Sequence, residues 1–352
     1  LVINGGTIYG DLTDGSRNPL RDRVAVTVSP TFSDVLPNVG NPPSARREET
    51  AKYLYYMGDG PQPRFWRAMR DLGLDDVMAM HFGGIWWTRG GEGFSMRHRP
   101  RPEMSEADLA GYREEVKSLG YPFGLLVEYT DYFPCNEFWD PNKVGLDSQG
   151  QWGPAWYGHY ATKPNAYVEL ARKTGELIRA KYPTDAVYLD VHTNVGLVSK
   201  DYEAGVPGAG KATATVLYNG EGVLEVGRQH GIVCSEGIYR WLYAGLTDMD
   251  YATWYTTGSA SDKPLLPDFD LLKIHPQAHG TAMGYSPWAF FPPEKAAKVF
   301  SEESAPRATM EFYHYLAATI AHGHQAILGY GVRPQPARMV QYYCLLQGLQ
   351  QE

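Results

Sequence analysis

An α/β fold of the (β/α)8 TIM-barrel class is predicted by three features of this sequence. Short apolar segments alternate with segments of helical periodicity from about residue 50 onward, as in consecutive βα units. Two of the apolar segments, 186–190 and 231–236, each end in one carboxylate. Long connections, two of them rich in aromatic residues, follow predicted strands. A barrel of about 250 residues fits within a chain of 352 residues.

Eight strands are predicted from runs of apolar and β-branched residues. They cover residues 53–57, 76–82, 123–129, 186–190, 231–236, 248–254, 271–275 and 325–328. The first contains the run KYLYYM, which could equally form a helix. We assign residues 1–49 to a short N-terminal β extension and linker, and residues 50–352 to the barrel. The sequence at both ends suggests that flanking domains have been lost.

Helices are predicted between these strands. Residues 64–73, 105–120, 164–182 and 306–323 have apolar residues at helical spacing, and 204–216 is a Gly-rich loop followed by a possible helix. Segment 105–120 opens with Ser105 and ends with Gly120, which are typical capping residues. Segment 164–182 starts with proline, which the first helical turn accepts.

Three long connections leave the C-terminal ends of predicted strands. They cover residues 83–104, 130–163 and 276–305. Active sites of (β/α)8 barrels are built from the loops at this face. Loops of this length are usually functional or disordered, and the aromatic content of these argues against disorder.

Composition narrows the classes of partner. The net charge of −8 argues against nucleic acid, and no apolar run is long enough for a membrane span. The three cysteines lack metal-ligand spacing, so we expect no metal and no cofactor. The chain opens without the basic start and apolar core of a signal peptide, which leaves a secreted or a cytoplasmic bacterial enzyme open, along with its oligomeric state.

Asp190 and Glu236 are the candidate catalytic residues. Side chains alternate along a strand, so Asp190 shares a direction with Tyr188 and His192, and Glu236 points into the same barrel mouth from the next strand. Two carboxylates so placed are the minimum equipment of a glycosidase. We expect Asp190 to be the nucleophile, held ionised by Tyr188 and His192, and Glu236 to be the acid. The structural alternative is a pair of strand-end carboxylates in salt bridges.

The runs VYLDVHT, CSEGIYRW and DFDLLKIHP…HGTAMGY resemble the catalytic barrel of retaining α-N-acetylgalactosaminidases of glycoside hydrolase families 101 and 129, which are related to the α-amylase clan. The resemblance covers residues 50–350. It implies an Asp nucleophile at Asp190, a Glu acid/base at Glu236 and α-linked glycans as substrates. Tyr188 departs from the pattern, since the α-amylase clan usually has arginine two residues before its nucleophile.

Further polar and aromatic residues near strand ends and in the long loops are candidates for binding the sugar. Of the adjacent Trp86 and Trp87, we expect one to stack on substrate and the other to pack. The full set of candidates is His81, Trp86, Trp87, Glu128, Asp131, Trp152, Trp156, His192, Tyr239, Arg240, Asp250, His275 and His279.

Two other classes of function stay open. A metal-dependent barrel isomerase or amidohydrolase would use His81, Glu128, Asp190, His192 and His275 as ligands. Against it, no HxH pair ends the first strand and no lysine ends a middle strand. A non-catalytic carbohydrate-binding barrel would bind sugar without turnover.

Overall fold

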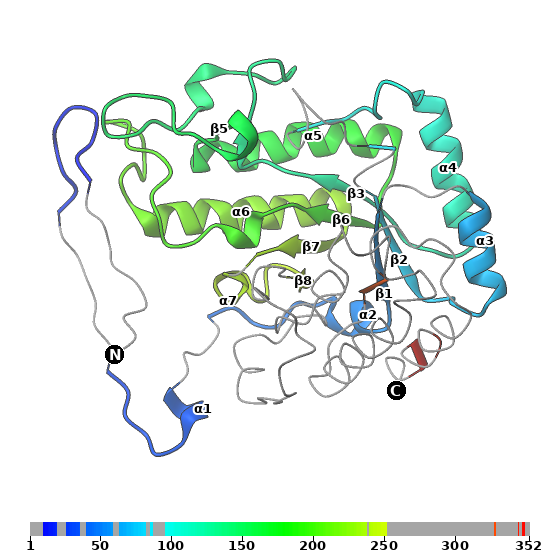
Figure 1. Cartoon of the computed structure of the whole chain (residues 1–352). Helices are drawn as coiled ribbons and strands as arrows, with labels where there is room; N and C mark the ends of the chain where they lie inside the picture. Colours follow the sequence, from blue (N-terminus) through cyan, green and yellow to red (C-terminus); the bar gives the residue numbers. More distant parts are fainter. Residues whose placement is uncertain are drawn as a thin grey trace, which may run out of the picture.

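A computed structural model describes residues 10–19, 26–35, 40–58, 63–81, 85–86, 96–237, 239–251, 327–328, 344 and 347–348 of the chain. Within these ranges the molecule is a curled, parallel β-sheet with helices on its outer side (Figure 1). None of the described helices is long and apolar enough to cross a membrane.

Seven parallel strands form the main sheet, in the spatial order β8–β7–β6–β3–β2–β1–β9. The strands are β1 (Leu54–Gly58), β2 (Val77–His81), β3 (Phe123–Val127), β6 (Ala186–Leu189), β7 (Ile232–Glu236), β8 (Met249–Tyr251) and β9 (Ile327–Leu328). All seven fall within predicted strands or one residue beyond them, and KYLYYM is a strand rather than a helix. The seventh predicted strand, 271–275, lies outside the described residues.

The strand order is that of a curled βα sheet. β1 to β8 of the main sheet follow one another in sequence, and β9, from the end of the chain, pairs with β1 in parallel. Sequential parallel pairing with the last strand beside the first is the arrangement that a (β/α)8 barrel requires. A half-barrel is thus established, and closure into eight strands stays a prediction.

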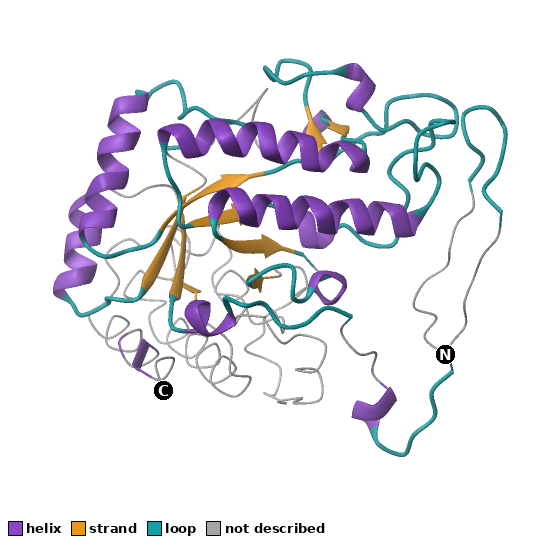
Figure 2. Ribbon diagram, turned by 180° about the vertical axis from the view of Figure 1, so that it is seen from behind, coloured by secondary structure: helices purple, strands orange, loops and turns teal. Residues whose placement is uncertain are grey.

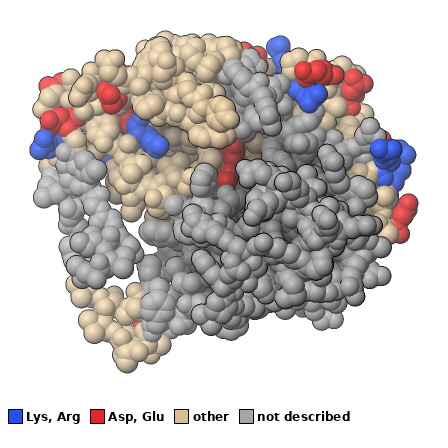
Figure 3. Space-filling view, viewed as in Figure 1, with Lys and Arg blue, Asp and Glu red and all other residues tan. Residues whose placement is uncertain are grey.

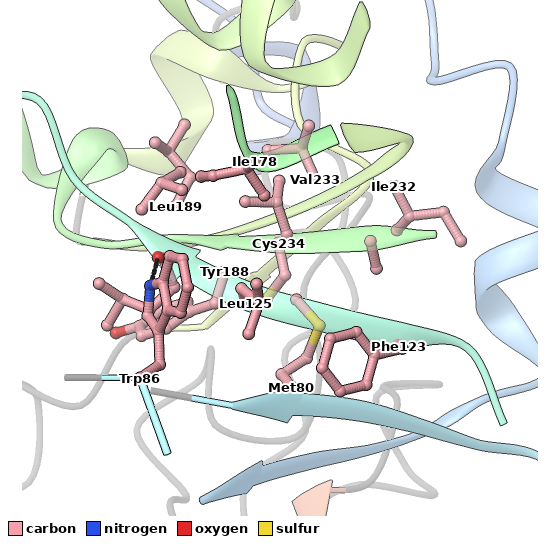
Figure 4. Close-up of a cluster of buried hydrophobic side chains, with 14 of the residues drawn as sticks. Met80, Trp86, Phe123, Leu125, Ile178, Tyr188, Leu189, Ile232, Val233 and Cys234 are labelled. Carbon is pink, nitrogen blue, oxygen red and sulfur yellow. Dashed lines mark hydrogen bonds between the residues drawn. The ribbon is translucent and has the colours of Figure 1, made fainter. Parts of the chain in front are cut away.

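The outer layer is made by α3 (Pro63–Asp71), α4 (Glu106–Ser118), α5 (Tyr167–Lys181) and α6 (Ala212–His230). α3 and α4 lie beside β1 to β3, whereas α5 and α6 lie beside β6 and β7 (Figure 2). Leu189 and Val233 extend from the sheet toward Ile178 of α5 (Figure 4). The apolar residues of β2, β3 and β6 are buried in the core between the two layers.

Local signals explain where the helices begin and end. Ser105 caps α4 in a capping box with Asp108, and Gly120 follows the helix at φ 90°. α5 is preceded by a 3-10 turn over Pro164–Ala166, so the α-helix begins later than the predicted residue 164. Gly231 ends α6 at φ 94°, and a Cβ there would lie 2.3 Å from a backbone oxygen of Asp185.

The 130–163 connection is ordered by a small antiparallel sheet of β4 (Asp131–Tyr132) and β5 (Tyr160–Ala161). Two 3-10 turns, η1 (Pro141–Lys143) and η2 (Trp156–Gly158), also lie in this connection. A further 3-10 turn, η4 (His192–Asn194), follows β6. Short helices α1 (Phe32–Val35), α2 (Arg47–Ala51) and α7 (Arg240–Tyr243) lie elsewhere in the loops. The aromatic content of 130–163 thus belongs to a built substructure.

The N-terminal segment packs against the barrel at two places. The backbone N–H of Thr13 donates to Tyr202 over 3.0 Å, and the amide of Asn18 donates to Ala209. Further along, the guanidinium of Arg46 lies 3.8 Å from the carboxylate of Asp248, the residue before β8. The described part of residues 1–49 holds isolated bridges and short helices, and the predicted β extension and domain boundary stay predictions.

Candidate active site

The candidate site is centred on one hydroxyl between two carboxyl groups. The Tyr188 hydroxyl lies 2.7 Å from Oδ1 of Asp190 and 3.0 Å from Oε2 of Glu236. Tyr188 and Glu236 lie on β6 and β7, whose register pairs Tyr188 with Cys234, two residues before Glu236. Because alternation gives paired residues the same side of the sheet, all three side chains point into the barrel mouth.

These distances limit how far apart the two carboxyl groups are. The two named oxygens can be no further apart than the sum of the two contacts to the hydroxyl, 2.7 and 3.0 Å. That limit is shorter than the roughly 6.5–9.5 Å that inverting glycosidases leave for a water molecule. The two carboxyl groups also share a side-chain hydrogen bond, so they lie closer to each other than this limit.

The electrostatics of the pair are set by burial. Asp190 is 8 % exposed, whereas Glu236 is partly exposed. Burial raises the pKa of the Asp190 carboxyl well above its usual range, and the neighbouring Glu236 carboxyl raises it further. The hydrogen bond from Tyr188 opposes this rise, because it stabilises the ionised form.

The backbone after Asp190 is strained. Val191 has φ 47°, a left-handed conformation that is a genuine outlier for a β-branched residue, and strain of this kind clusters at functional sites. The loop after β6 also touches the loop after β7, since a Cβ on Gly237 would lie 2.0 Å from the backbone nitrogen of Asn194. Only glycine permits this approach, which fixes the two strand ends against each other.

A second acidic pair lies beside the first. The Glu128 carboxylate follows β3 and accepts the backbone N–H of Asp131 at 3.0 Å, and Asp131 lies 3.7 Å from Nδ1 of His159. Burial raises the pKa of Glu128 well above its usual range, with Asp131 and Asp190 adding to the rise. The predicted binding residues Glu128 and Asp131 are therefore placed electrostatically close to Asp190.

Acidic atoms are visible near the centre of the face shown in Figure 3, whereas the other charged side chains seen in this view lie toward the edges of the molecule.

His81 does not reach the candidate site, so its prediction as a sugar ligand is wrong. It is fully buried, and its ring lies against Tyr56, Trp66, Tyr112 and Phe123 on the helix side of the sheet. Burial lowers the pKa of His81 to about 3. The error has a simple cause: the side chain occupies an outward-facing position of β2, and strand-end polarity alone does not reveal this.

His192 is also directed away from the pair. The turn at Val191 breaks the alternation that would have carried it into the barrel mouth. Its Nδ1 lies 2.6 Å from Oδ1 of Asn219 on α6, and its Nε2 accepts the backbone N–H of Tyr129. Of the two residues predicted to hold Asp190 ionised, Tyr188 contacts it and His192 packs behind the sheet.

Asp250, on β8, likewise faces the side of the sheet opposite to that of Glu236. The register pairs it with Ser235, and it accepts the hydroxyl of Thr193 at 2.9 Å. The backbone N–H of Thr193 in turn donates to the Ser235 hydroxyl at 3.2 Å. Asp250 therefore steadies the loop after Asp190 instead of binding substrate directly.

The tryptophans divide into buried and exposed ones. Trp86 is fully buried, its indole donates to a backbone oxygen of Leu126 at 2.7 Å (Figure 4), and it is the packing member of its pair. Trp152 is 42 % exposed and Trp156 is 56 % exposed. Trp87 lies outside the described residues.

The remaining predictions fall near the mouth or outside the described residues. The Tyr239 backbone N–H donates to Thr193 at 2.9 Å, and its ring lies against Gly196, which keeps it beside the loop after Asp190. Arg240 begins α7, and its side chain is not among those described. His275 and His279 lie outside the described residues. The residue that sequence reasoning undervalued is Tyr188, whose shared direction with Asp190 was the available signal.

Comparisons with known proteins identify solved structures with a similar fold. No family model and no curated protein matches this chain. A quadruple mutant of an α-N-acetylgalactosaminidase from Bifidobacterium bifidum is similar with a TM-score of 0.60 and 13 % identity, over 87 % of this chain and 52 % of that one. A family 36 α-galactosidase from Geobacillus stearothermophilus is similar with a TM-score of 0.53 and 12 % identity, over 90 % of this chain and 43 % of that one.

These similarities show that the chain has a barrel-like α/β fold of the kind found in those structures. At such low identity they show the fold alone. The chain spans about half the length of the structures that it matches.

Proposed function

We propose that this chain is a retaining glycoside hydrolase acting on α-linked glycans, with α-N-acetylgalactosaminides as the first substrates to test. The observation that carries the proposal is the Asp190 and Glu236 pair around the Tyr188 hydroxyl, at 2.7 and 3.0 Å. Retaining enzymes need one ionised and one protonated carboxyl group at short range. The fold shared with an α-N-acetylgalactosaminidase and an α-galactosidase supports the same reaction class. The narrower assignment to families 101 and 129 belongs to this proposal.

The chemistry assigns one role to each carboxyl group. Asp190 attacks the anomeric carbon and forms a covalent glycosyl intermediate, while Glu236 gives its proton to the departing glycosidic oxygen. Glu236 then takes a proton from water, which attacks the intermediate and releases the sugar with its original anomeric configuration.

Burial alone would place the proton of the pair on Asp190, which is opposite to what the attack requires. Two effects act in the required direction. The Tyr188 hydroxyl lies nearer to Asp190 than to Glu236, and the positive charge that develops on the sugar in the transition state favours an ionised Asp190.

A metal-dependent enzyme is disfavoured by the placement of its ligands. His81 and His192 both lie on the helix side of the sheet, so they cannot converge with Asp190 on one ion. Among the described residues, no group of three or more suitable side chains is arranged to hold a metal. A non-catalytic sugar-binding barrel would differ from the proposal only in turnover.

A panel of p-nitrophenyl α- and β-glycosides tests the proposal, with α-N-acetylgalactosaminide and α-galactoside included. The anomer first released is followed by proton NMR. We expect turnover of an α-glycoside with the α-anomer as the first product. The β-anomer as first product would remove the retaining mechanism. Sugar binding by calorimetry with no turnover of any glycoside would favour the non-catalytic alternative.

A further inference from the structure

The turn that follows β3 is held by the carboxyl group of Glu128. This residue is 1 % exposed, and its carboxyl group accepts the backbone N–H groups of Thr130 and Asp131 together with the Thr130 hydroxyl. Side-chain oxygens that accept nearby backbone N–H groups fix the conformation of a short turn. Glu128 therefore serves its own turn, and the next carboxyl group that the turn presents is that of Asp131.

This turn begins beside the proposed nucleophile. Val127, the last residue of β3, pairs with Leu189 of β6, and its carbonyl oxygen accepts the backbone N–H of Asp190 at 2.9 Å. Burial is the main cause of the raised pKa of Asp190, and the Asp131 carboxyl group is close enough to add to the rise. In the sheet, β3 and β7 lie on opposite sides of β6. Asp131 is thus reached from Asp190 in the direction away from Glu236.

His159 stands behind Asp131 on the small antiparallel sheet. The register pairs Asp131 of β4 with Ala161 of β5. His159 has an extended backbone and lies two residues before Ala161, so its side chain is on the same side as that of Asp131. Its Nδ1 lies 3.7 Å from Oδ2 of Asp131, which is too long for a hydrogen bond.

The His159 ring is enclosed by protein. The residue is 4 % exposed, its ring lies 5.0 Å from that of Phe133, and Nδ1 has no hydrogen-bond partner among the described residues. A buried polar atom without a partner is unfavourable. A movement on the order of 1 Å would bring Nδ1 into hydrogen-bond range of Asp131. Hydrogen bonds at enzyme sites are often long without ligand and shorten when it binds.

We propose that Asp131 binds one hydroxyl group of the sugar that is released, and that His159 is the positioning residue behind it. The inference rests on the proposed function and deepens it. The sugar hydroxyl donates to the Asp131 carboxylate, and Nδ1–H of His159 donates to the same carboxylate from the protein side. The bond to be broken lies between Asp190 and Glu236, so the leaving group extends toward Glu236 and the sugar ring extends toward β3. The hydroxyl is therefore one remote from the anomeric carbon, at C3, C4 or C6.

A carboxylate at this place suits a neutral hydroxyl. A hydroxyl donates to it, whereas an anionic substituent on the sugar would be repelled by both Asp131 and Asp190. A site that hydrogen-bonds a hydroxyl group rejects the analogue without it strongly, because the buried polar groups of the site are then left unpaired. Asp131 thus determines specificity for the sugar and takes no part in bond cleavage.

Deoxy sugars test the contact directly. The 3-, 4- and 6-deoxy forms of p-nitrophenyl α-N-acetylgalactosaminide and α-galactoside are compared with their parents. We expect kcat/KM of the wild type to fall by about 10–100-fold for one of the three positions. Asp131→Ala should lower kcat/KM on the parent by a similar factor. It should then treat parent and deoxy form within about twofold of each other, because the group that tells them apart is gone.

Two variants of His159 separate a positioning role from a packing role. His159→Asn keeps a donor near the position of Nδ1, whereas His159→Gln moves it toward that of Nε2. His159→Asn should keep the discrimination against the deoxy form, and His159→Gln should lose most of it. His98→Gln is the matched control, since His98 is also buried but has both ring nitrogens in contact, with Glu137 at 2.8 Å and Lys181 at 3.3 Å. It should leave the discrimination unchanged.

Binding of the same glycosides to Asp190→Asn, alone and combined with Asp131→Ala, gives the result without turnover when it is measured by calorimetry. Equal treatment of the parent and all three deoxy forms by the wild type would overturn the inference, as would unchanged discrimination in Asp131→Ala. If Asp131→Ala does not fold, equal behaviour of His159→Asn and His159→Gln would do the same. Discrimination in binding that depends on Asp131, without turnover of any glycoside, would leave the hydroxyl site standing and remove the proposed function. Turnover without discrimination would do the reverse.

Discussion

The ends of β2 and of β6 look alike in sequence but differ in the folded chain. Each apolar run leads into a polar residue, His81 in one and Asp190 in the other. Asp190 meets a hydroxyl and a second carboxyl group inside the barrel mouth, whereas His81 is enclosed by aromatic rings of the outer layer. The side of the strand on which a residue lies decides whether its side chain reaches the barrel mouth or packs against the helices. A shift of one residue along the strand exchanges these two sides.

The largest expected effect comes from removing the charge of Asp190, the proposed nucleophile. Asp190→Asn should lower kcat on an α-glycoside by a factor on the order of 10³ or more, while far-UV circular dichroism and Tm stay close to wild type. The change keeps the shape of the side chain and removes only its charge. If Asp190→Asn keeps more than a tenth of wild-type kcat, the end of β6 is not the centre of the reaction.

Glu236→Gln should have an effect that depends on the leaving group. For a natural glycan with a basic leaving oxygen we expect a loss in kcat/KM of about 10²–10⁴-fold, because general acid catalysis is absent. A dinitrophenyl glycoside needs little protonation and should lose far less. Equal losses on both substrates would exchange the roles of the two carboxyl groups or remove them.

The exposed and buried tryptophans provide a third contrast. Trp156→Ala should lower kcat/KM on a natural glycan by about tenfold with an unchanged Tm, if the 130–163 loop is a wall of the sugar site. Trp86→Ala should lower the free energy of unfolding by about 3–5 kcal/mol, because it empties a buried site and leaves a backbone oxygen without its donor. Trp156→Phe is the control for aromatic contact. Wild-type kcat/KM for both Trp156→Ala and Trp152→Ala would exclude this wall.

The smallest expected effect is that of His81→Phe. Activity should stay within about twofold, and the free energy of unfolding at pH 7 should stay equal or rise by about 1 kcal/mol, since two buried ring nitrogens that lack partners are removed. The folded pKa of His81, about 3, lies below its unfolded value of 6.5, so the unfolded chain binds the extra proton between these values. Wild-type stability should therefore fall as pH drops from about 6.5 toward 3, and His81→Phe should lose part of that fall in urea titrations. An unchanged pH slope would contradict the assigned burial.

Sequence predicted most of the described barrel because its strands are continuous apolar runs between strong helix signals. Ser105 and Gly120 mark the ends of one helix on chemical grounds, and the parallel register follows from the alternation of elements. The pair of Asp190 and Glu236 was also within reach, because both obey strand alternation and lie on adjacent strands.

What sequence could not supply depends on tertiary position. The left-handed turn at Val191 is invisible in a run such as LDVHT, and it redirects His192 to α6. Burial of Trp86 depends on a backbone oxygen of a distant strand, which no local pattern contains. The side on which His81 faces follows from the register of β1 and β2, and this appears only when the sheet is assembled.

The contact at Gly237 limits how far the ends of β6 and β7 can be moved apart. Converting a retaining site into an inverting one means moving two carboxyl groups apart until a water molecule fits between them. Here the loops that follow the two strands touch backbone to backbone, with room for no side chain at residue 237. Shortening either acid would open a gap, but the anchoring main chains would stay in place. A side chain introduced at residue 237 would push the two main chains themselves apart, and with them the strand ends that carry Asp190 and Glu236.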